Sequence, residues 1–152
     1  MPTTVITYGT FDMFHVGHLR LLKRMSALGD RIIVGVSTDE FNARKGKKAL
    51  IPFEERKEII ESLSCVDLVI PENEWEQKPD DIRRHDVDLF VMGDDWAGKF
   101  DHLLKYCRVR YLERTNGVSS TELRESLRRL LSSEHEITAM LGLLKTLQRG
   151  LD

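Results

Sequence analysis

The 152-residue sequence is poor in the features that define several large classes of protein. Cysteine occurs only as Cys65 and Cys107, without a CxxC spacing, so we expect neither a disulfide framework nor a thiolate metal site. No apolar run approaches the length of a membrane span, and no basic segment followed by an apolar one opens the chain. These absences predict a cytoplasmic protein that does not insert into a membrane.

An excess of charge of one sign is also missing. The chain has 23 Lys and Arg against 25 Asp and Glu, which gives a formal net charge of −2. Proteins that bind nucleic acid through a broad surface usually carry a basic excess, so we expect no nucleic-acid partner. Repeats and linkers rich in Pro, Gly or Ser are lacking too, and the length suits one domain.

What the sequence does contain is an alternation of short β-branched runs with helical patterns. Apolar runs of this length are typical of parallel strands that are covered on both faces. The alternation predicts an α/β fold: a single Rossmann-like, doubly wound parallel five-stranded sheet with helices on both faces, plus a C-terminal helix. The predicted strands are residues 4–8, 31–37, 66–70, 87–92 and 109–112, and the predicted helices are 18–28, 53–63, 79–85, 119–131 and 134–149.

Two Ser-x-x-Glu capping boxes mark the C-terminal part of the chain. Ser119 with Glu122, and Ser133 with Glu136, predict two separate helices. An amphipathic helix most often packs on its own domain, and the alternative is a contact with another subunit. The apolar face of the last helix carries Ile137, Met140, Leu141, Leu144 and Leu147.

Polar and glycine-containing segments follow four of the predicted strands. They are residues 9–18, 37–48, 93–99 and 113–121. In folds of this class, ligands bind outside the carboxyl ends of the strands. If the sheet is parallel, all four segments therefore lie at one edge and form the binding site.

An HxGH motif, His15 to His18, follows the first strand and opens a helix. The free N–H groups of a helix N-terminus attract an anion, and Gly17 lets the backbone approach a phosphate closely. The two imidazoles can donate hydrogen bonds to phosphate oxygens. The alternative is a core histidine beside a helix-capping one, and a metal site is disfavoured because no further ligand stands at a standard spacing.

Four cations, Arg44, Lys45, Lys47 and Lys48, follow the second strand within five positions. Such a run is by default a solvated surface. At the same edge as the HxGH motif it would instead hold the negative charge of a polyphosphate. Asp95, after the fourth strand, would either recognise a ligand or cap a short helix.

A second candidate phosphate cradle follows the fifth strand. Arg114 can bind a phosphate bidentately, Gly117 allows a tight turn, and Ser119 opens a helix whose N-terminus faces the same edge. The hydroxyls of Ser120 and Thr121 would complete the cradle, although the segment is also an ordinary helix cap. Two cradles that face each other across one sheet predict a nucleoside triphosphate as the ligand.

Together, the segments YGTFDMFHVGH, RKGKK, VIPENEWEQK, VMGDDW and RTNGVSST resemble the glycerol-3-phosphate cytidylyltransferases, a family within the HxGH nucleotidyltransferase superfamily. The resemblance covers residues 4–131 and defines a nucleotidyltransferase domain at 1–131, which residues 132–152 extend as a helix. It implies a Mg²⁺-dependent transfer of CMP from CTP to glycerol 3-phosphate, with CDP-glycerol and pyrophosphate as products. CDP-glycerol serves teichoic acid or related surface polymers, and such enzymes are usually homodimers.

The resemblance also implies roles for individual residues. His15, His18, Lys45 and Arg114 are the expected catalytic residues, and Asp12 would orient a magnesium-bound water. The expected contacts of the acceptor phosphate are Lys47, Lys78 and Trp75. The expected nucleotide contacts are Thr10, Phe11, His15, Val16, Gly17, His18, Lys45, Asp95, Arg114, Thr115, Asn116, Gly117, Val118, Ser119, Ser120 and Thr121.

The acceptor phosphate is already a nucleophile and needs little or no general base. Catalysis is therefore expected from in-line alignment and from stabilisation of charge on the α-phosphate and on the leaving pyrophosphate. Two features depart from the family: Ser64 stands where relatives carry arginine, and the last helix is longer than in the short form of the family. The alternatives are a cytidylyl- or adenylyltransferase acting on another phosphorylated acceptor, and a non-catalytic nucleotide-binding module.

Overall fold

The computed structural model describes residues 1–115, 117 and 119–149. The chain forms two compact units, Met1–Gly117 and Val118–Asp152, which are described separately below. Two predicted nucleotide contacts, Asn116 and Val118, lie outside the described residues. The predicted domain boundary after residue 131 stays a prediction.

The first unit is built on a five-stranded sheet in the order β3-β2-β1-β4-β5, in which all neighbouring strands are parallel. The order runs outward from β1 to β3 on one side and resumes with β4 on the other, so the topological switch point lies between β1 and β4. This confirms the predicted α/β class with a parallel five-stranded sheet. The strands are β1 Thr4–Gly9, β2 Arg31–Ser37, β3 Leu68–Glu72, β4 Leu89–Gly93 and β5 Arg108–Leu112.

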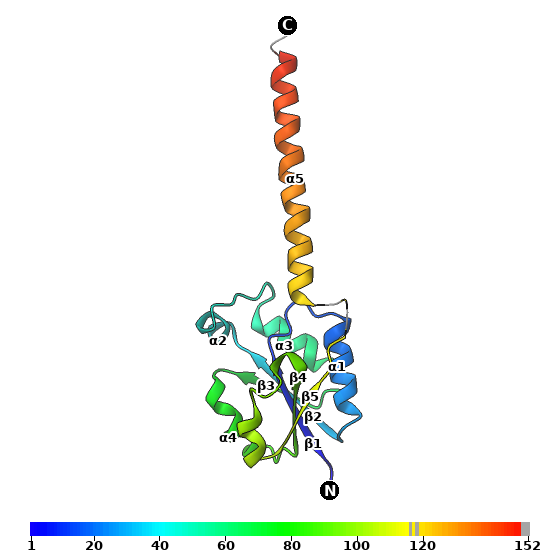
Figure 1. The fold of residues 1–152 in the computed structure, drawn as a ribbon, viewed down its shortest axis with the longest axis vertical. Helices are drawn as coiled ribbons and strands as arrows, with labels where there is room; N and C mark the ends of the chain where they lie inside the picture. The colour runs from blue at the N-terminus through cyan, green and yellow to red at the C-terminus, as the bar shows by residue number, and fades with distance from the viewer. Residues whose placement is uncertain (116, 118, 150–152) are drawn as a thin grey trace. The chain divides into compact units, whose positions relative to one another are not determined.

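Four helices and three 3₁₀ turns connect these strands (Figure 1). Three of the helices were expected from the sequence. The helix over Asp39–Arg44 was not, because its six residues DEFNAR contain a single large apolar side chain, Phe41, and show no helical period. The helices are α1 Val16–Ser26, α2 Asp39–Arg44, α3 Phe53–Glu61 and α4 Lys78–Arg84, and the 3₁₀ turns are η1 Trp75–Gln77, η2 Asp94–Trp96 and η3 Asp101–Lys105.

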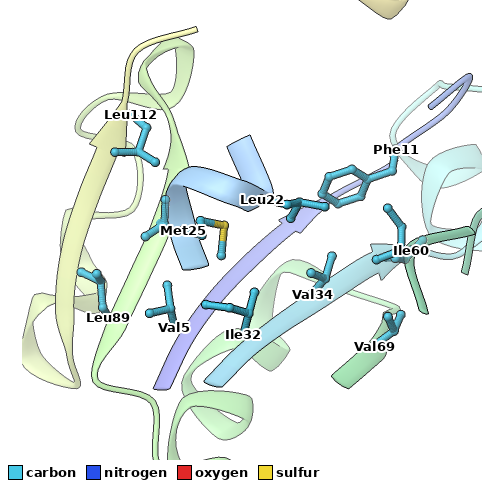
Figure 2. Close-up of a cluster of buried hydrophobic side chains, with 12 residues drawn as sticks. Val5, Phe11, Leu22, Met25, Ile32, Val34, Ile60, Val69, Leu89 and Leu112 are labelled. Atoms are coloured by element: carbon cyan, nitrogen blue, oxygen red, sulfur yellow. The ribbon is translucent and has the colours of Figure 1, made fainter. Parts of the chain in front are cut away.

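A hydrophobic core covers each face of the sheet. Alternate residues of β1 point to opposite faces, so Val5 joins one cluster and Ile6 joins the other. The first cluster receives Leu22 and Met25 from α1 and Ile60 from α3, as Figure 2 shows. The second cluster includes Ile82 of α4, Phe90 of β4 and Leu103 of η3. Helical elements therefore pack on both faces and leave the carboxyl ends of the strands to carry the site.

The second unit contains one helix, α5, which runs from Ser120 to Arg149. Its 30 residues correspond to a length of about 45 Å. Ser119 accepts the backbone N–H of Glu122 at its Oγ (3.0 Å), as the first capping box predicts. No helix in the described part of the chain is long and apolar enough to cross a bilayer.

The predicted break between two C-terminal helices is wrong. Ser133 does not cap a new helix, because its hydroxyl donates to the carbonyl of Arg129 at 2.9 Å inside α5. Thr138 donates in the same way to the carbonyl of Glu134. A serine that satisfies its hydroxyl on the preceding turn is compatible with a continuous helix, and no proline or glycine separates residues 131 and 134.

Candidate active site

The candidate site lies at the carboxyl ends of the parallel strands. Residues 9–18, 37–48, 93–99 and 113–115 follow β1, β2, β4 and β5 and leave the sheet at the same edge. The sheet is parallel, as the sequence analysis required for this placement.

The HxGH motif forms the start of α1. His15 is the N-cap residue, and its Nδ1 accepts the backbone N–H of Gly17 at 3.0 Å. The Nδ1 of His18 accepts the backbone N–H of His15 at 3.2 Å, and the two rings stack with centroids 3.8 Å apart. Since both Nδ1 atoms are acceptors, each neutral imidazole carries its proton on Nε2. Both Nε2–H groups are thereby left as hydrogen-bond donors.

Both imidazoles are held in the neutral form. Burial, followed by the proximity of His15, lowers the pKa of His18 to about 4, although Asp12 opposes the shift. Burial and the positive charge of Arg114 lower the pKa of His15. The histidines at this helix start can therefore donate hydrogen bonds to an anion at neutral pH without titrating.

The Nε2 of His15 is buried and has no hydrogen-bond partner in the described part of the chain. A buried donor without a partner costs about 1–3 kcal/mol, so native proteins rarely keep one without a reason. The helix cap uses the Nδ1 side of each ring. The capping role considered for this motif is therefore real, and it leaves the Nε2 side for a ligand.

The four cations that follow β2 separate in the structure. Lys45 turns inward: its Nζ lies 3.3 Å from Ser37 Oγ and 4.1 Å from the centroid of the Phe41 ring. Burial lowers the pKa of Lys45 to about 8, although Glu72 opposes the shift. Arg44 donates to the carbonyl of Asn73. The remaining two, Lys47 and Lys48, are exposed.

The segments after β4 and β5 meet through an ion pair. Arg114 Nη1 lies 3.7 Å from Asp95 Oδ2, and both side chains are about half exposed. The charge of Arg114 also contributes to the lowered pKa of both motif histidines. Gly117 has φ +80°, a left-handed conformation that suits the tight turn predicted there. Ser119, Ser120 and Thr121 open α5 in the second unit.

Two of the three expected acceptor contacts line a pocket of about 440 Å³ in the first unit. Lys78 begins α4 and is almost fully buried, with its Nζ 2.6 Å from Glu72 Oε2. Its ammonium also lies 4.7 Å from the ring centroid of Trp75. Lys47 is not among the lining residues, which are Trp75, Glu76, Lys78, Trp96, Lys99, Phe100 and His102.

Glu72 connects the two inward-facing lysines, and the sequence analysis missed it. Its Oε2 accepts from Lys78, and its Oε1 accepts the hydroxyl of Ser37 at 2.6 Å. The Ser37 hydroxyl oxygen in turn accepts from Lys45 at 3.3 Å. The signal in the sequence was a carboxylate at the end of a strand, in register with the last residue of β2.

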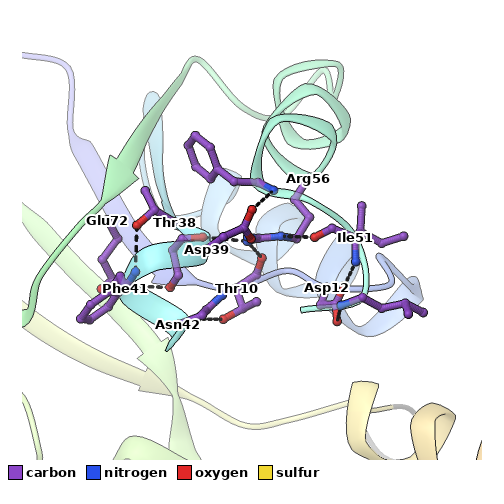
Figure 3. A network of polar contacts seen from close by, with 12 residues as sticks. Thr10, Asp12, Thr38, Asp39, Phe41, Asn42, Ile51, Arg56 and Glu72 are labelled. Carbon is purple, nitrogen blue, oxygen red and sulfur yellow. Dashed lines mark hydrogen bonds and ion pairs between the residues drawn. The ribbon is translucent and has the colours of Figure 1, made fainter. Parts of the chain in front are cut away.

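Arg56 is a second residue that the sequence analysis missed, and it ties together the loops at the sheet edge (Figure 3). Its guanidinium donates to the carbonyls of Thr10 (2.7 Å), Ser37 (2.8 Å) and Ile51 (2.8 Å). It also pairs with Asp39 at 2.7 Å, while its own side chain is fully buried. The available signal was its position four residues before the buried Ile60, on the inward stripe of α3.

Asp12 fixes the loop that leads into α3 (Figure 3). Its carboxylate accepts the backbone N–H groups of Leu50 (2.8 Å) and Ile51 (2.9 Å). The neighbouring Phe11 and Met13 have φ values of 52° and 47°, which are unusual for residues with a side chain. Backbone strain of this kind costs about 1–3 kcal/mol and gathers at functional sites.

Comparisons with known proteins identify cytidylyltransferases as relatives of this chain. The model of the cytidylyltransferase-like family matches residues 6–126. The chain is 57% identical to the glycerol-3-phosphate cytidylyltransferase of Bacillus spizizenii over 81% of this chain and 95% of that protein. It is 54% identical to the enzyme of the same name from Staphylococcus aureus, over 81% of this chain and 93% of that protein. The ethanolamine-phosphate cytidylyltransferase of Mus musculus is 32% identical over 76% of this chain and 30% of that protein.

Solved structures share the fold. A lipopolysaccharide core biosynthesis protein from Thermoplasma volcanium superposes with a TM-score of 0.65 at 23% identity, over 76% of this chain and 100% of that one. A bifunctional NMN adenylyltransferase/ADP ribose pyrophosphatase from Francisella tularensis gives a TM-score of 0.63 at 18% identity, over 83% of this chain and 42% of that one. At such identities the likeness concerns the fold alone.

Proposed function

The chain belongs to the cytidylyltransferase-like family and, within it, to the glycerol-3-phosphate cytidylyltransferases, and on this basis we propose that it transfers CMP from CTP to glycerol 3-phosphate. The products are CDP-glycerol and pyrophosphate. The structural observation that best supports this activity is the buried Nε2 of His15, which has no partner within the described residues. A donor at the start of a helix, at the edge where ligands bind, suits an α-phosphate.

The two motif histidines stabilise the α-phosphate as attack proceeds. Their Nε2–H groups donate to its oxygens, and the negative charge on those oxygens rises in the pentacoordinate transition state. Because the pKa of each imidazole is lowered, both rings are neutral at pH 7 and act as hydrogen-bond donors rather than as acids. The other residues that we propose as nucleotide contacts are Thr10, Phe11, Val16, Gly17, Asp95, Thr115 to Thr121 and the cations Lys45 and Arg114.

Lys45 and Arg114 hold the β- and γ-phosphates and stabilise the leaving pyrophosphate. Arg114 provides a planar guanidinium that can bind two phosphate oxygens, and about half of its side chain is exposed. Lys45 lies against Phe41 and Ser37, where burial already disfavours its charge. The negative charge of a triphosphate placed there would favour the charged form of the lysine.

The acceptor occupies the pocket lined by Trp75 and Lys78. A phosphate monoester has a second pKa of about 6, so at pH 7 it is largely dianionic and can attack phosphorus without a general base. We assign to Trp75, Lys78 and Lys47 the task of holding this phosphate in line with the leaving group. Alignment of two bound reactants can contribute about 7–11 kcal/mol to catalysis.

The residues fit a magnesium ion that is carried by the triphosphate rather than one held by the protein. The described residues contain no group of three or more His, Cys, Asp or Glu side chains that could hold a metal ion. Magnesium is commonly bound by substrate phosphates and waters with one or two carboxylates, and Asp12 near His18 is the proposed carboxylate, acting through a water. When bound, the ion would supply positive charge on the triphosphate.

Pyrophosphate release with each nucleoside triphosphate and a panel of phosphorylated acceptors tests this proposal. We expect CTP with glycerol 3-phosphate to be the fastest pair, and mass spectrometry to identify CDP-glycerol. Faster turnover with ATP or with another acceptor would contradict the assignment of substrates. Nucleotide binding without pyrophosphate release from any pair would identify a binding module instead.

The resemblance supports three further proposals about context. The enzyme acts in the cytoplasm, where CTP is available, and its CDP-glycerol serves teichoic acid or a similar surface polymer. It works as a homodimer. Chromatography with light scattering gives the number of chains, and the loss of such polymers in cells depleted of the enzyme tests the role of its product.

A further inference from the structure

Helix α5 carries a long row of exposed aliphatic side chains. Leu123, Leu127 and Leu130 are followed by Ile137, Leu141 and Leu144, so that the spacing alternates between four and three residues. The only interruption in this series is Glu134. Such an alternation is the heptad pattern of helices that pack against one another in a coiled coil. The side chains of this row, called the α5 seam below, are 39–68% exposed.

Within the described residues of the second unit, nothing covers the α5 seam. All residues from Glu125 to Thr146 are exposed, and helices in water derive most of their stability from packing of an apolar face. Leu131 and Met140 flank the seam with 64% and 61% of their surface exposed. A row of this extent on a protein surface marks a site of interaction.

We infer that α5 pairs with α5 of a second copy of this chain as an antiparallel coiled coil. The family model ends at residue 126, and the relatives are matched over 93–95% of their length while 19% of this chain stays unmatched. Most of the seam therefore lies outside the part shared with those enzymes. A heptad row is complementary to a second copy of itself, because each apolar knob meets the same spacing of holes.

The charges of α5 favour a second copy over a lipid surface. Helices that lie on membranes combine an apolar face with a polar face rich in Lys and Arg. In α5, the acidic residues are nearly as many as the basic ones, and Arg128 pairs with Glu125 on the outer side. The acidic residues are Glu122, Glu125, Glu134 and Glu136, and the basic residues are Arg124, Arg128, Arg129, Lys145 and Arg149.

Glu134 determines the direction of pairing. In a parallel pair in register, this carboxylate would face the same carboxylate of the second copy inside an apolar seam, and like charges repel there. In an antiparallel pair, Glu134 faces Leu130 of the second copy. The same register sets Leu127 opposite Ile137 and Leu123 opposite Leu141, so these layers are apolar, and it sets Leu144 opposite Ser120 at the start of α5. Leu131 then lies beside Leu131 of the second copy at the flank.

A spin label at Thr146, on the outer side of α5, measures this arrangement in the full chain. The label is attached to Thr146→Cys in a background in which Cys65 and Cys107 are replaced by serine. The antiparallel register puts the two labels 28 residues apart along the axis and on opposite outer sides of the pair, so we expect an intermolecular distance of about 45–50 Å. A distance of about 20–25 Å, two helix diameters, would mean a parallel pair and would overturn the assigned direction.

A matched pair of double variants shows whether the seam makes the contact. Leu130→Asp with Ile137→Asp puts two charges into the seam, whereas Ser132→Asp with Ala139→Asp puts the same charges, seven residues apart, on the outer side. We expect the seam variant to lose the intermolecular distance of about 45–50 Å. The outer variant should behave as the parent chain. Equal behaviour of the two variants, or absence of any intermolecular distance in the parent, would overturn the proposal.

Two controls distinguish the pairing of α5 from the proposed reaction and from binding to a membrane surface. The seam variant should retain pyrophosphate release with CTP and glycerol 3-phosphate, so a failure of the proposed reaction would leave the pairing of α5 unaffected. Cosedimentation with phosphatidylglycerol–phosphatidylcholine vesicles tests the lipid alternative. If the parent chain binds these vesicles through the seam and shows no pairing in solution, the partner is a membrane surface and the proposal is wrong.

Discussion

The ammonium of Lys78 lies 2.6 Å from the carboxylate of Glu72, and the two side chains are only 1% and 3% exposed. Both oxygens of this carboxylate are used, since the other accepts the Ser37 hydroxyl. The ammonium also lies 4.6 Å from the ring centroid of Tyr8. A cation held in this way cannot turn to water if its carboxylate partner is removed. Glu72 therefore stabilises Lys78 in the wall of the pocket that this lysine lines with Trp75.

Replacing Glu72 by glutamine should lower the free energy of unfolding by about 3–5 kcal/mol, because it leaves a buried ammonium without its counter-charge. Urea denaturation measures this loss. Asp80→Asn is the control, since the pair of Asp80 with Arg83 is largely exposed and should contribute less than about 1 kcal/mol. A Glu72→Gln variant as stable as the control would mean that Lys78 is neutral or finds another partner.

Arg56→Lys should destabilise the protein although it keeps the charge. A lysine offers one ammonium, whereas the planar guanidinium of Arg56 reaches three carbonyls and Asp39 from one buried position. We expect a loss of about 3 kcal/mol or more together with weaker CTP binding, because Thr10 and Ser37 lie at the site. Thermal melting and calorimetric titration with CTP measure the two effects. Arg83→Lys, in an exposed ion pair, should change neither the stability nor the affinity for CTP. If Arg56→Lys also leaves both unchanged, the four contacts of Arg56 contribute little to stability.

Much of the fold could be predicted because its signals are local. The strand at residues 31–37 has the uncharged core IIVGV, and the HxGH motif stands where a strand ends and a helix begins. The role of Arg56 could not be read in this way, since an arginine in a helix is usually solvated and only the tertiary structure buries it. The role of Lys78 could not be predicted either, because its pairing with Glu72 depends on how α4 and β3 come together in the folded chain. The missed helix over Asp39–Arg44 is too short to show a period.

Binding of CTP should weaken above pH 8 because of Lys45. The pKa of this lysine is lowered to about 8, so in the free enzyme its ammonium deprotonates as the pH rises through that value. The charged form binds the triphosphate, and the dissociation constant should therefore rise up to about tenfold per pH unit above 8. Calorimetry in buffers of different ionisation enthalpy should detect proton uptake on binding at pH 8. Lys45→Arg should remove both effects; an unchanged pH dependence in that variant would exclude Lys45 as their source.

His18 should make the fold less stable as the pH falls from about 6.5 to 4. Its pKa is about 4 in the folded protein against 6.5 for an ordinary histidine, so the unfolded chain takes up the proton first. Above pH 6.5 neither state is protonated and the effect is absent. Integrated over this window, the loss reaches about 3 kcal/mol. Denaturation at several pH values measures it, and NMR titration of the imidazole gives the pKa directly. His18→Asn should show a shallower decline; an equal one would assign the loss to other groups.

Two substitutions of His18 distinguish the roles of its two ring nitrogens, Nδ1 and Nε2. Asparagine can place its Oδ1 where Nδ1 stands and keep the bond from the His15 N–H, but it has no donor at the position of Nε2. Glutamine can place an N–H near Nε2, but a side chain in that position does not also accept the His15 N–H at its Oε1. His18→Asn should therefore keep the melting temperature and lose activity, whereas His18→Gln should lose a cap, worth about 0.5–2 kcal/mol, and keep more activity.

If Nε2–H acts on the transition state, kcat of His18→Asn should fall by about 10²–10³-fold, with little change in the dissociation constant of CTP. The bond to the α-phosphate strengthens only as charge builds up during attack, so ground-state binding does not report it. Steady-state kinetics with glycerol 3-phosphate and calorimetric titration of CTP, run on both variants, give the two quantities. A near-normal kcat for His18→Asn would reduce the HxGH motif to a helix cap. The role of stabilising the α-phosphate would then fall to the unpartnered Nε2 of His15 and to the backbone N–H groups of the helix N-terminus.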